Sequence, residues 1–305
     1  MSDCAVVWIR DDFRIRNNHA LSFACKNHDA VTVIYIHNKE YFDGKREAQR
    51  WWIGKSLESF SNDLEKFNIK LETIISDETS FYSKLKTKDK ISIYWNKVYE
   101  PDHLKLDKEI EKILEKKNIP FKFFKGNILN EYQSITKNDG TPFKVFSPFW
   151  RNAEQVFLDA VPQKTSEIKK LKSKKTLFNS KSTFKQIMPK KDWFKKFDQY
   201  WKPSEDEAHK NLKEFISNRI SKYGVDRDYP SINGSSKLSP YIRNGQIHVA
   251  AIYEKSSKDI KKNISIRKYI NELGWREFSH SLINYFPQML KGNLRKEFDR
   301  FPWEK

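Results

Sequence analysis

Short apolar segments alternate with helical patterns over the first 124 residues, and this alternation constrains the fold more than any other feature. Five segments have the length and residue types of buried strands: 5–9, 30–36, 71–75, 91–95 and 120–124. Helical patterns lie between them, and Pro101 opens the one before the last strand. Strands that alternate with helices predict an α/β fold with a parallel, doubly wound, Rossmann-like sheet.

Sheets of this kind bind ligands at the C-terminal ends of their strands. We therefore expect the loops after Ile9, Ile36 and Trp95 to form the mouth of any site in this half of the chain. No GxGxxG or Walker-type loop occurs, and the first glycine is Gly44. A glycine-rich dinucleotide or nucleoside triphosphate site is therefore not expected here.

The alternation stops near residue 131, and the change in pattern divides the chain. The predicted parts are an α/β domain at 1–133, a basic connector at 134–200 and an all-helical segment at 201–305. Lysine and serine dominate from Lys164 to Lys191, which is typical of a linker. Ser204 and Glu207 form a predicted capping box at the start of the helical segment.

The composition is basic, with 58 Lys and Arg against 40 Asp and Glu and a formal net charge of +18. A polyanionic partner is the natural inference, although a generally lysine-rich composition gives the same number. Cys4 and Cys25 form no CxxC motif, and His and Cys show no metal-ligand spacing, so we expect neither a disulfide framework nor a metal site. The absence of a signal peptide and of a long apolar run predicts a soluble, cytoplasmic protein with no membrane partner.

A polar loop before a short helix, Gly234–Tyr241 (GSSKLSPY), has the residue types of an anion-binding cradle. Its hydroxyl donors are Ser235, Ser236 and Ser239. Gly234 permits a turn, and Pro240 suits the first position of a helix whose free N–H groups favour an anion. Gly245 would end this helix. Taken alone, the loop fits an ordinary capped helix better than a ligand site.

A second candidate is the helix predicted from Ser265 to Phe286, which Ser265 could cap. Its apolar stripe contains Ile266, Ile270, Leu273, Phe278 and Leu282. Four other residues recur at i, i+3, i+4 and i+7 on the side away from Ile266 and Leu273: Glu272, Trp275, Arg276 and Ser279. An acid, an indole and a guanidinium therefore share one surface. The alternative is an exposed face with an intrahelical Glu272–Arg276 pair, worth about 0.2–0.5 kcal/mol.

Several motifs stand in one order along the chain. They are Trp8–Arg14 (WIRDDFR) with Asn17–Leu21 (NNHAL), Trp95–Pro101 (WNKVYEP), Pro142–Trp150 (PFKVFSPFW), the 234–241 cradle and Asn271–Phe278 (NELGWREF). Together they resemble the DNA photolyase and cryptochrome family over nearly the whole chain. The resemblance implies an N-terminal antenna domain, a C-terminal helical domain that holds a U-shaped FAD, and DNA that docks on a basic face.

In that family, reduced flavin excited by near-UV or blue light gives an electron to a flipped-out pyrimidine dimer, the cyclobutane ring splits, and the electron returns. The resemblance thus implies a deoxyribodipyrimidine photolyase, a carbon–carbon lyase whose partner is DNA containing pyrimidine dimers. The residues that would hold FAD are Tyr223, Ser235, Ser236, Leu238 and Ser239, with Arg276 adding charge. Trp275 would stack on the extruded dimer, and Glu272 would hydrogen-bond the base edge.

The resemblance also suggests roles at the protein surface. Lys237, Arg243 and the lysines between Lys164 and Lys196 are candidates for DNA phosphate contact, with a merely solvated basic surface as the alternative. Trp303 stands where the family carries the outer end of a tryptophan chain that reduces the flavin. The antenna chromophore would be folate or deazaflavin, held by loops near Arg10, His37 and Asn96, or would be absent.

The sequence departs from the family pattern at two places. Ser235 stands where relatives commonly carry threonine, which preserves the hydroxyl. The family segment that follows Trp303, with helices against the flavin ring, has no counterpart, so we expect an incomplete flavin pocket and weak or no repair by this chain alone. It would be a fragment, a truncated product, or a partner of a second chain that supplies the remainder; otherwise a monomer is expected.

Two other functions stay open beside repair of cyclobutane dimers. They are a cryptochrome-type blue-light photoreceptor and a chromophore-binding or DNA-binding remnant without chemistry. The pair Glu272 and Trp275 favours repair. Repair of the six-four photoproduct is less expected, because no histidine pair stands in the substrate region.

Overall fold

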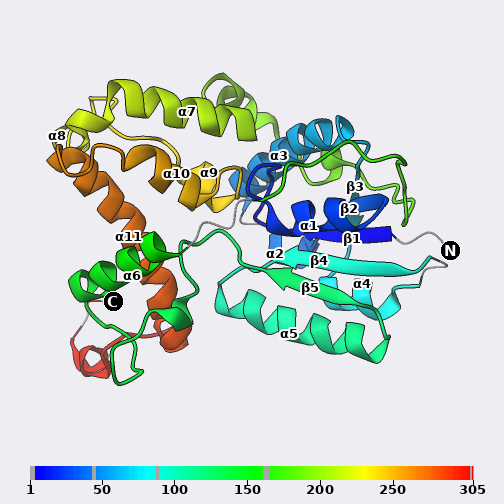
Figure 1. Cartoon of the computed structure of the whole chain (residues 1–305), viewed down its shortest axis with the longest axis horizontal. Coiled ribbons are helices and arrows are strands. Elements are labelled where there is room, and N and C mark those ends of the chain that lie inside the picture. The colour runs from blue at the N-terminus through cyan, green and yellow to red at the C-terminus, as the bar shows by residue number, and fades with distance from the viewer. Residues whose placement is uncertain (1–3, 43–45, 87–88, 161–164, 303, 305) are drawn as a thin grey trace.

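The computed structural model describes residues 4–42, 46–86, 89–160, 165–302 and 304. It consists of an α/β half, which carries one sheet with its helices, and a helical half built from the later elements of the chain. The two halves lie side by side, and the C-terminal ends of the strands point toward the helical half (Figure 1). Among the described residues, no helix is both long and apolar enough to cross a membrane.

The α/β half contains one parallel, five-stranded sheet. Its strands are β1 (Cys4–Ile9), β2 (Ala30–His37), β3 (Lys70–Ile75), β4 (Ile91–Asn96) and β5 (Phe121–Phe124). Their order is β3-β2-β1-β4-β5, so the chain winds outward from β1 in both directions. This confirms the predicted doubly wound α/β fold, with each strand within about two residues of its predicted bounds.

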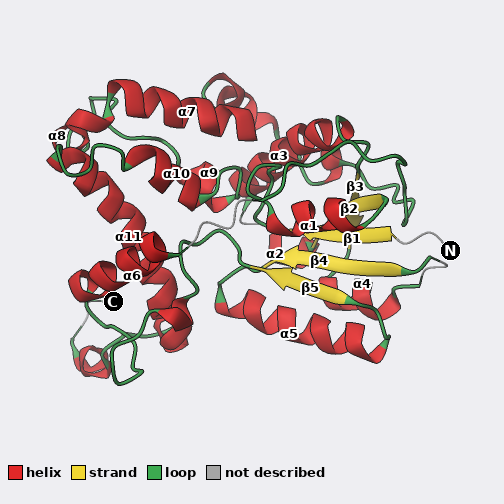
Figure 2. Cartoon of the chain, viewed as in Figure 1, coloured by secondary structure: helices red, strands yellow, loops and turns green. Residues whose placement is uncertain are grey.

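Helices cover both faces of the sheet (Figure 2). They are α1 (His19–Asn27), α2 (Lys39–Phe42), α3 (Glu47–Glu65), α4 (Glu78–Lys84) and α5 (Pro101–Lys116). Successive residues of β1 enter different cores, because side chains alternate along a strand: Val7 lies in the cluster with α1 and α3, and Val6 lies in the cluster with α4 and α5. All six residues of β1 are buried.

The connector between the halves is fixed to the sheet, although its composition is typical of a linker. Residues 165–191 form no regular element except the turn Phe184–Gln186. The buried carboxylate of Glu72 in β3 accepts three backbone N–H groups of this segment, from Leu177, Phe178 and Ser180, at 2.9–3.1 Å. The segment therefore packs along the outer strand of the sheet rather than moving as a free tether.

The helical half contains α6 (Phe146–Asp159), α7 (Glu205–Asn218), α8 (Tyr223–Asp226), α9 (Ser239–Arg243), α10 (Val249–Ser256) and α11 (Ile264–Tyr285). Short 3₁₀ turns cover Tyr132–Ser134, Asp192–Gln199, Ile220–Lys222, Pro287–Leu290 and Lys296–Arg300. The predicted start of α7 is confirmed, because the Ser204 hydroxyl accepts the Glu207 N–H at 3.1 Å. The predicted cap of α11 is wrong: Asn263, not Ser265, caps this helix by accepting two N–H groups of its first turn.

Several buried contacts hold the two halves together. Arg14, almost fully buried, donates from Nη1 to the Gly245 carbonyl oxygen at 2.9 Å. Trp52 of α3 donates from Nε1 to Gln246 Oε1 at 2.9 Å. Gly245 has a φ of +65°, and a Cβ there would lie 1.8 Å from the Asp11 carbonyl oxygen. The predicted helix stop at Gly245 is therefore also a point of close backbone approach between the halves.

Candidate functional site

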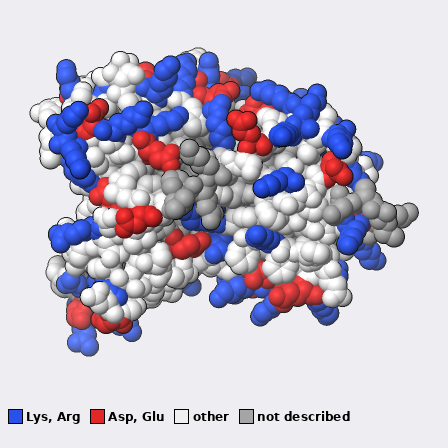
Figure 3. Space-filling model, viewed as in Figure 1, with Lys and Arg blue, Asp and Glu red and all other residues white. Residues whose placement is uncertain are grey.

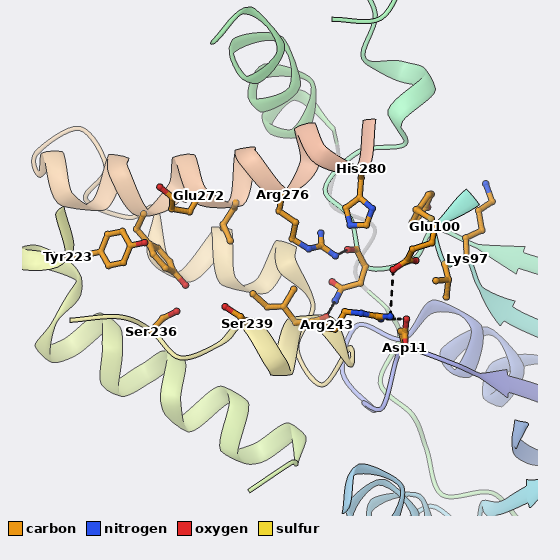
Figure 4. A pocket seen from close by; sticks show the side chains of 16 residues that line it. Asp11, Lys97, Glu100, Tyr223, Ser236, Ser239, Arg243, Glu272, Arg276 and His280 are labelled. Carbon is orange, nitrogen blue, oxygen red and sulfur yellow. Dashed lines mark hydrogen bonds and ion pairs between the residues drawn. The ribbon is translucent and has the colours of Figure 1, made fainter. Parts of the chain in front are cut away.

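A cavity of about 420 Å³ opens between α11 and the loops that follow β1 and β4. Its walls come from both halves (Figure 4). Five residues predicted from separate parts of the chain line it together: Tyr223, Ser236, Ser239, Glu272 and Arg276. The α/β half contributes Asp11 from the loop after β1 and Lys97 and Glu100 from the loop after β4. Cavity-lining loops thus follow β1 and β4, as the parallel sheet predicts.

One face of α11 forms a wall of the cavity. Its members recur at i, i+3, i+4, i+7 and i+11: Tyr269, Glu272, Leu273, Arg276 and His280. Leu273 is 4% exposed and the Glu272 side chain is 39% exposed, so Glu272 lies on the more exposed side of α11, as predicted, although both residues line the cavity. Tyr269 and His280 were missed, although both stand at helical spacing from predicted residues. Burial and the neighbouring Arg276 and Arg243 lower the pKa of His280 to about 3.

The predicted cradle divides into residues that face the cavity and residues that do not. Ser236 and Ser239 line the cavity. Ser235 is exposed elsewhere, and Leu238 is fully buried in the core of the helical half. Lys237 lies at an exposed turn with a φ of +53°, which accounts for the change of direction between Ser235 and Ser239. Pro240 lies in the first turn of α9, as predicted.

Arg276 is anchored by the α/β half, not by Glu272. Its Nη2 donates to the Asn127 carbonyl oxygen at 2.7 Å, and its Nη1 donates to Glu277 Oε1 at 3.0 Å. The predicted intrahelical Glu272–Arg276 pair is therefore wrong. The Glu277 carboxylate also accepts the Leu129 N–H at 2.8 Å. Burial raises the pKa of Glu277 and lowers the pKa of Arg276. Through their hydrogen bonds to Leu129 and Asn127, the two side chains link α11 to the loop after β5.

Glu272 instead pairs with a residue that the sequence analysis missed. Arg227 Nη1 lies 2.5 Å from Glu272 Oε1, and the guanidinium carbon lies 5.1 Å from the centre of the Tyr223 ring. Hydrogen bonding to Glu272 raises the pKa of Arg227. Arg227 follows Tyr223 by four residues, and this helical spacing was the available signal. The pair orients the Glu272 carboxylate at the rim of the cavity.

Trp275 lies next to the cavity but does not line it. Its side chain is 46% exposed. One face of the indole is covered by Phe146 of α6, with ring centroids 3.8 Å apart and planes 8° from parallel. The opposite face remains the one that could take a base. The other predicted redox tryptophan, Trp303, lies outside the described residues.

Arg243 occupies the wall between this cavity and a second one. It forms ion pairs with Asp11 and with Glu100, the latter at 3.8 Å, as Figure 4 shows. All three residues also line the second cavity, of about 470 Å³, at the C-terminal ends of β1 and β2. These ion pairs direct Arg243 toward the α/β half. The predicted DNA contact of Arg243 stays a prediction.

The second cavity lies where the antenna chromophore was predicted. Arg10 lines it, together with Asn38 from the loop after β2. Arg10 donates to Asp107 of α5 at 2.7 Å, which fixes its guanidinium. His37 and Asn96 are buried and do not line the cavity; Asn96 donates to Asp12 Oδ2 at 2.6 Å. All three loops predicted for the antenna border this cavity, through Arg10, Asn38 and Glu100, and the chromophore stays a prediction.

Comparison with known proteins assigns the family. The family model for DNA photolyase matches residues 5–169, which is more than half of the chain. The chain belongs to the photolyase/cryptochrome family. The predicted family is thereby confirmed, and the match includes the α/β half and the first part of the connector.

Relatives extend the similarity over the rest of the chain. A deoxyribodipyrimidine photo-lyase of Agrobacterium fabrum is 30% identical over 98% of this chain and 63% of its own length. Cryptochrome-2 of Arabidopsis thaliana is 23% identical over 100% of this chain and 52% of its own length. The photolyase/cryptochrome chain described here thus spans less than two thirds of the length of these relatives.

Solved structures share the fold of this photolyase/cryptochrome family member. A bacterial class III photolyase from Agrobacterium tumefaciens superposes with a TM-score of 0.87 and 27% identity, over 100% of this chain and 64% of that structure. A cryptochrome from Synechocystis sp. PCC6803 superposes with a TM-score of 0.81 at 19% identity, over 99% of this chain and 65% of that structure. The second likeness concerns the fold alone.

Proposed function

We propose that this chain binds FAD and DNA containing pyrimidine dimers, and that it serves the light-driven repair of cyclobutane dimers as a deoxyribodipyrimidine photolyase. One observation carries the proposal. Hydroxyls of the 234–241 loop line one cavity with the Glu272 carboxylate and the Arg276 guanidinium of α11. The likeness to the Agrobacterium fabrum deoxyribodipyrimidine photo-lyase supports the same class of reaction.

The chemistry of the residues around the cavity fits FAD. A volume of about 420 Å³ falls within the range of small-molecule sites. Ser236 and Ser239 would donate hydrogen bonds to phosphate oxygens. Arg276 would supply positive charge, through the N–H groups that are not used in its bonds to Glu277 and Asn127. The α9 helix has only five residues, so the hydroxyls and Arg276 matter more than a helix dipole. When bound, reduced FAD supplies the electron that light drives into the dimer.

The DNA side of the proposed site consists of Glu272, Trp275 and their supports. A flipped-out base loses its stacking partners, and the outer face of Trp275 would replace one of them. Phe146 holds the indole from the other side. The Glu272 carboxylate, oriented by Arg227, would accept a hydrogen bond from the base edge. Lys237 would add a phosphate contact at the exposed turn.

We further propose that the second cavity takes a light-harvesting chromophore, folate or deazaflavin. A photolyase from Sulfolobus tokodaii that shares this fold, with a TM-score of 0.77 and 22% identity, was solved with two FAD molecules and an implied light-harvesting cofactor. Here the cavity of about 470 Å³ shares Asp11, Glu100 and Arg243 with the first, so a chromophore in it would sit close to the flavin. Proximity of this kind is what light harvesting needs.

A cryptochrome-type photoreceptor is the second candidate. The Phe146 stack is compatible with it, because the stack leaves only one face of Trp275 open to a base. The likeness to Cryptochrome-2 of Arabidopsis thaliana over the whole chain points the same way. Both functions would use the FAD cavity, so selective binding of damaged DNA is what separates them.

The test compares two duplexes of one sequence, with and without a single cyclobutane dimer, by fluorescence anisotropy in the dark. Repair predicts at least about tenfold tighter binding of the damaged duplex, and Trp275→Ala should abolish this preference. Trp193→Ala is the matched control, since that indole is exposed to a similar extent, 40%, and lies in the connector. Equal affinity for both duplexes would refute the repair function and leave the photoreceptor.

A second arm tests the chemistry. With photoreduced FAD, blue light should remove the dimer from the bound duplex, and the dark sample should keep it. Glu272→Gln should slow the loss of dimers without changing FAD affinity, because Glu272 is assigned to the base and not to the flavin phosphates. Loss of dimers at the wild-type rate in this variant would exclude the assigned role of Glu272.

A further inference from the structure

Residues 165–191 of the connector carry a dense run of positive charge. They contain nine lysines, no arginine and a single acidic residue, Glu167. This short segment therefore carries +8 of the formal net charge of +18. We call residues 165–191 the lysine strip.

The lysine strip is held in a fixed conformation on the α/β half. Three of its N–H groups bind the buried Glu72 carboxylate, and Ser182 forms an antiparallel bridge with Thr73 of β3. Leu171 and Ile187 are buried in the core beside the sheet. A cationic segment that is already ordered loses little conformational entropy when it binds a regular array of charges.

Most of the lysines in the strip point to solvent without an acidic partner. Lys174 pairs with Glu65, and Lys175 pairs with Asp89. Seven others are exposed and form no ion pair with any described residue: Lys169, Lys170, Lys172, Lys181, Lys185, Lys190 and Lys191. In Figure 3, Lys and Arg side chains gather over the upper right of the molecule, along α3 and the neighbouring connector.

The first part of the strip, up to Lys175, lies at the other end of the sheet from both cavities, and the rest returns along α3, where Arg50 donates to the Ile187 carbonyl oxygen at 2.9 Å. The Lys175 carbonyl oxygen accepts the Thr32 hydroxyl near the start of β2, and Lys175 pairs with Asp89 just before β4. The cavities open at the opposite, C-terminal ends of the strands. Figure 1 shows the connector reaching toward the N-terminal ends of the strands and then returning over α3 to α7. A short duplex engaged at the cavity would therefore not reach the first part of the strip, with Lys169, Lys170 and Lys172.

We propose that the lysine strip is a second nucleic-acid contact surface, which binds the phosphate backbone of undamaged duplex DNA independently of the FAD cavity. Duplex DNA presents a regular line of negative charges, and lysine ammonium groups contact phosphates as point charges without reading sequence. An anionic membrane is the poorer fit, because stable binding to lipid combines basic charge with buried apolar side chains, and those of Leu171 and Ile187 are already buried in the core. The surface would keep the protein on DNA between encounters with lesions.

The test uses the full chain and an undamaged duplex of about 25 base pairs in the dark, with affinity measured at several salt concentrations. The strip variant replaces Lys170, Lys172, Lys181 and Lys185 by Gln. We expect it to bind about tenfold more weakly near 0.1 M salt, with a salt slope that falls by roughly one unit for each lost phosphate contact. The strip variant should keep the wild-type ratio of affinities for dimer-containing and undamaged duplex, which separates the strip from the proposed lesion site.

The matched control removes four exposed lysines from α5, where acidic residues alternate with them: Lys105, Lys108, Lys112 and Lys116. Equal loss in both variants would overturn the proposal in favour of a general charge effect, and unchanged affinity in the strip variant would overturn it outright. Vesicles with anionic lipid form a further arm, in which binding of vesicles without binding of duplex also overturns it. If the strip variant unfolds at a lower temperature than the wild type, lysine acetylation of the wild type is measured by mass spectrometry instead. The proposal requires that bound duplex protects the lysines of the strip from acetylation and leaves those of α5 unprotected.

Discussion

The Trp275 indole and the Phe146 phenyl ring lie face to face, 3.8 Å apart between centroids and 8° from parallel. Phe146 begins α6, whereas Trp275 lies in the middle of α11. Gly274, beside Trp275, has no room for a side chain, since a Cβ there would lie 2.5 Å from the Trp150 ring. The orientation of the indole is thus set by a helix that the chain forms more than one hundred residues earlier.

Replacing Phe146 by Ala tests whether this stack prepares Trp275 for a base. Loss of the aromatic pair should cost about 0.5–1.5 kcal/mol of stability and weaken the preference for a dimer-containing duplex by roughly threefold to tenfold. Urea unfolding and anisotropy measure the two effects. Val145→Ala, at the exposed neighbouring position, should change neither. A stronger preference in the Phe146 variant would mean that Phe146 covers the face the base requires.

The 234–241 loop predicts a difference between adjacent serines. Ser236→Ala and Ser239→Ala should each weaken FAD binding about threefold to tenfold, the usual effect of one hydrogen bond. Ser235→Ala should leave FAD affinity unchanged, because Ser235 does not line the cavity. Quenching of flavin fluorescence measures all three. An equal loss in the Ser235 variant would contradict the division of the cradle.

The Arg227–Glu272 pair predicts a measurable but small coupling. Both side chains are more than a third exposed, at 34% and 39%, so solvent screens the pair. A double-mutant cycle with Arg227→Gln and Glu272→Gln should give about 0.2–1 kcal/mol in urea unfolding, and less at high salt. A coupling near zero at low salt would show that the pair does not hold the Glu272 carboxylate in place.

We expect an added methyl group at Gly245 to cost a large part of the free energy of unfolding. Both Gly245 and Gly140 have positive φ, +65° and +77°, so alanine at either position costs about 1–2 kcal/mol of backbone strain. At Gly245 the methyl group also meets the Asp11 carbonyl oxygen, whereas nothing lies within 4 Å at Gly140. Gly245→Ala should therefore lose about 1–3 kcal/mol more than Gly140→Ala in urea unfolding. Equal losses of stability in the two variants would mean that the contact between Gly245 and the Asp11 carbonyl oxygen relaxes at no cost.

His280 predicts that acid weakens the fold. Its pKa is lowered from 6.5 to about 3, so below pH 6.5 the unfolded chain binds a proton that the folded chain does not. Stability from this residue is complete above pH 6.5 and declines as the pH falls toward 3, by at most about 1.4 kcal/mol per unit. His280→Gln should lose less stability than the wild type between pH 7 and 5. An identical pH dependence in the two proteins would exclude His280 as a contributor.

The sequence was sufficient to predict the sheet, because the signals for each strand lie within a few neighbouring residues. Each strand, such as Ala30–His37, is a short apolar run between helical patterns, and parallel connection follows from the alternation. The start of α7 was likewise predictable, since Ser204 acts within one turn.

The inner geometry of the site was not predictable, because it depends on contacts between distant segments. Glu272 and Arg227 meet across 45 residues, and only the packing of α8 on α11 brings them together. The cavity wall on α11 was also not readable from the pattern, because it combines the predicted Glu272 and Arg276 with the buried Tyr269 and Leu273. Which of the serines face inward depends on the left-handed turn at Lys237.

Arg14 donates hydrogen bonds to both halves, to the carbonyl oxygens of Asn17 and Gly245. An α/β half produced alone, residues 1–133, would lose the second acceptor and would expose the Trp52 ring that Gln246 now caps. This half is thus not a portable module: a chimera that imports it from a relative would have to import the 242–247 segment as well, or restore each of these acceptors.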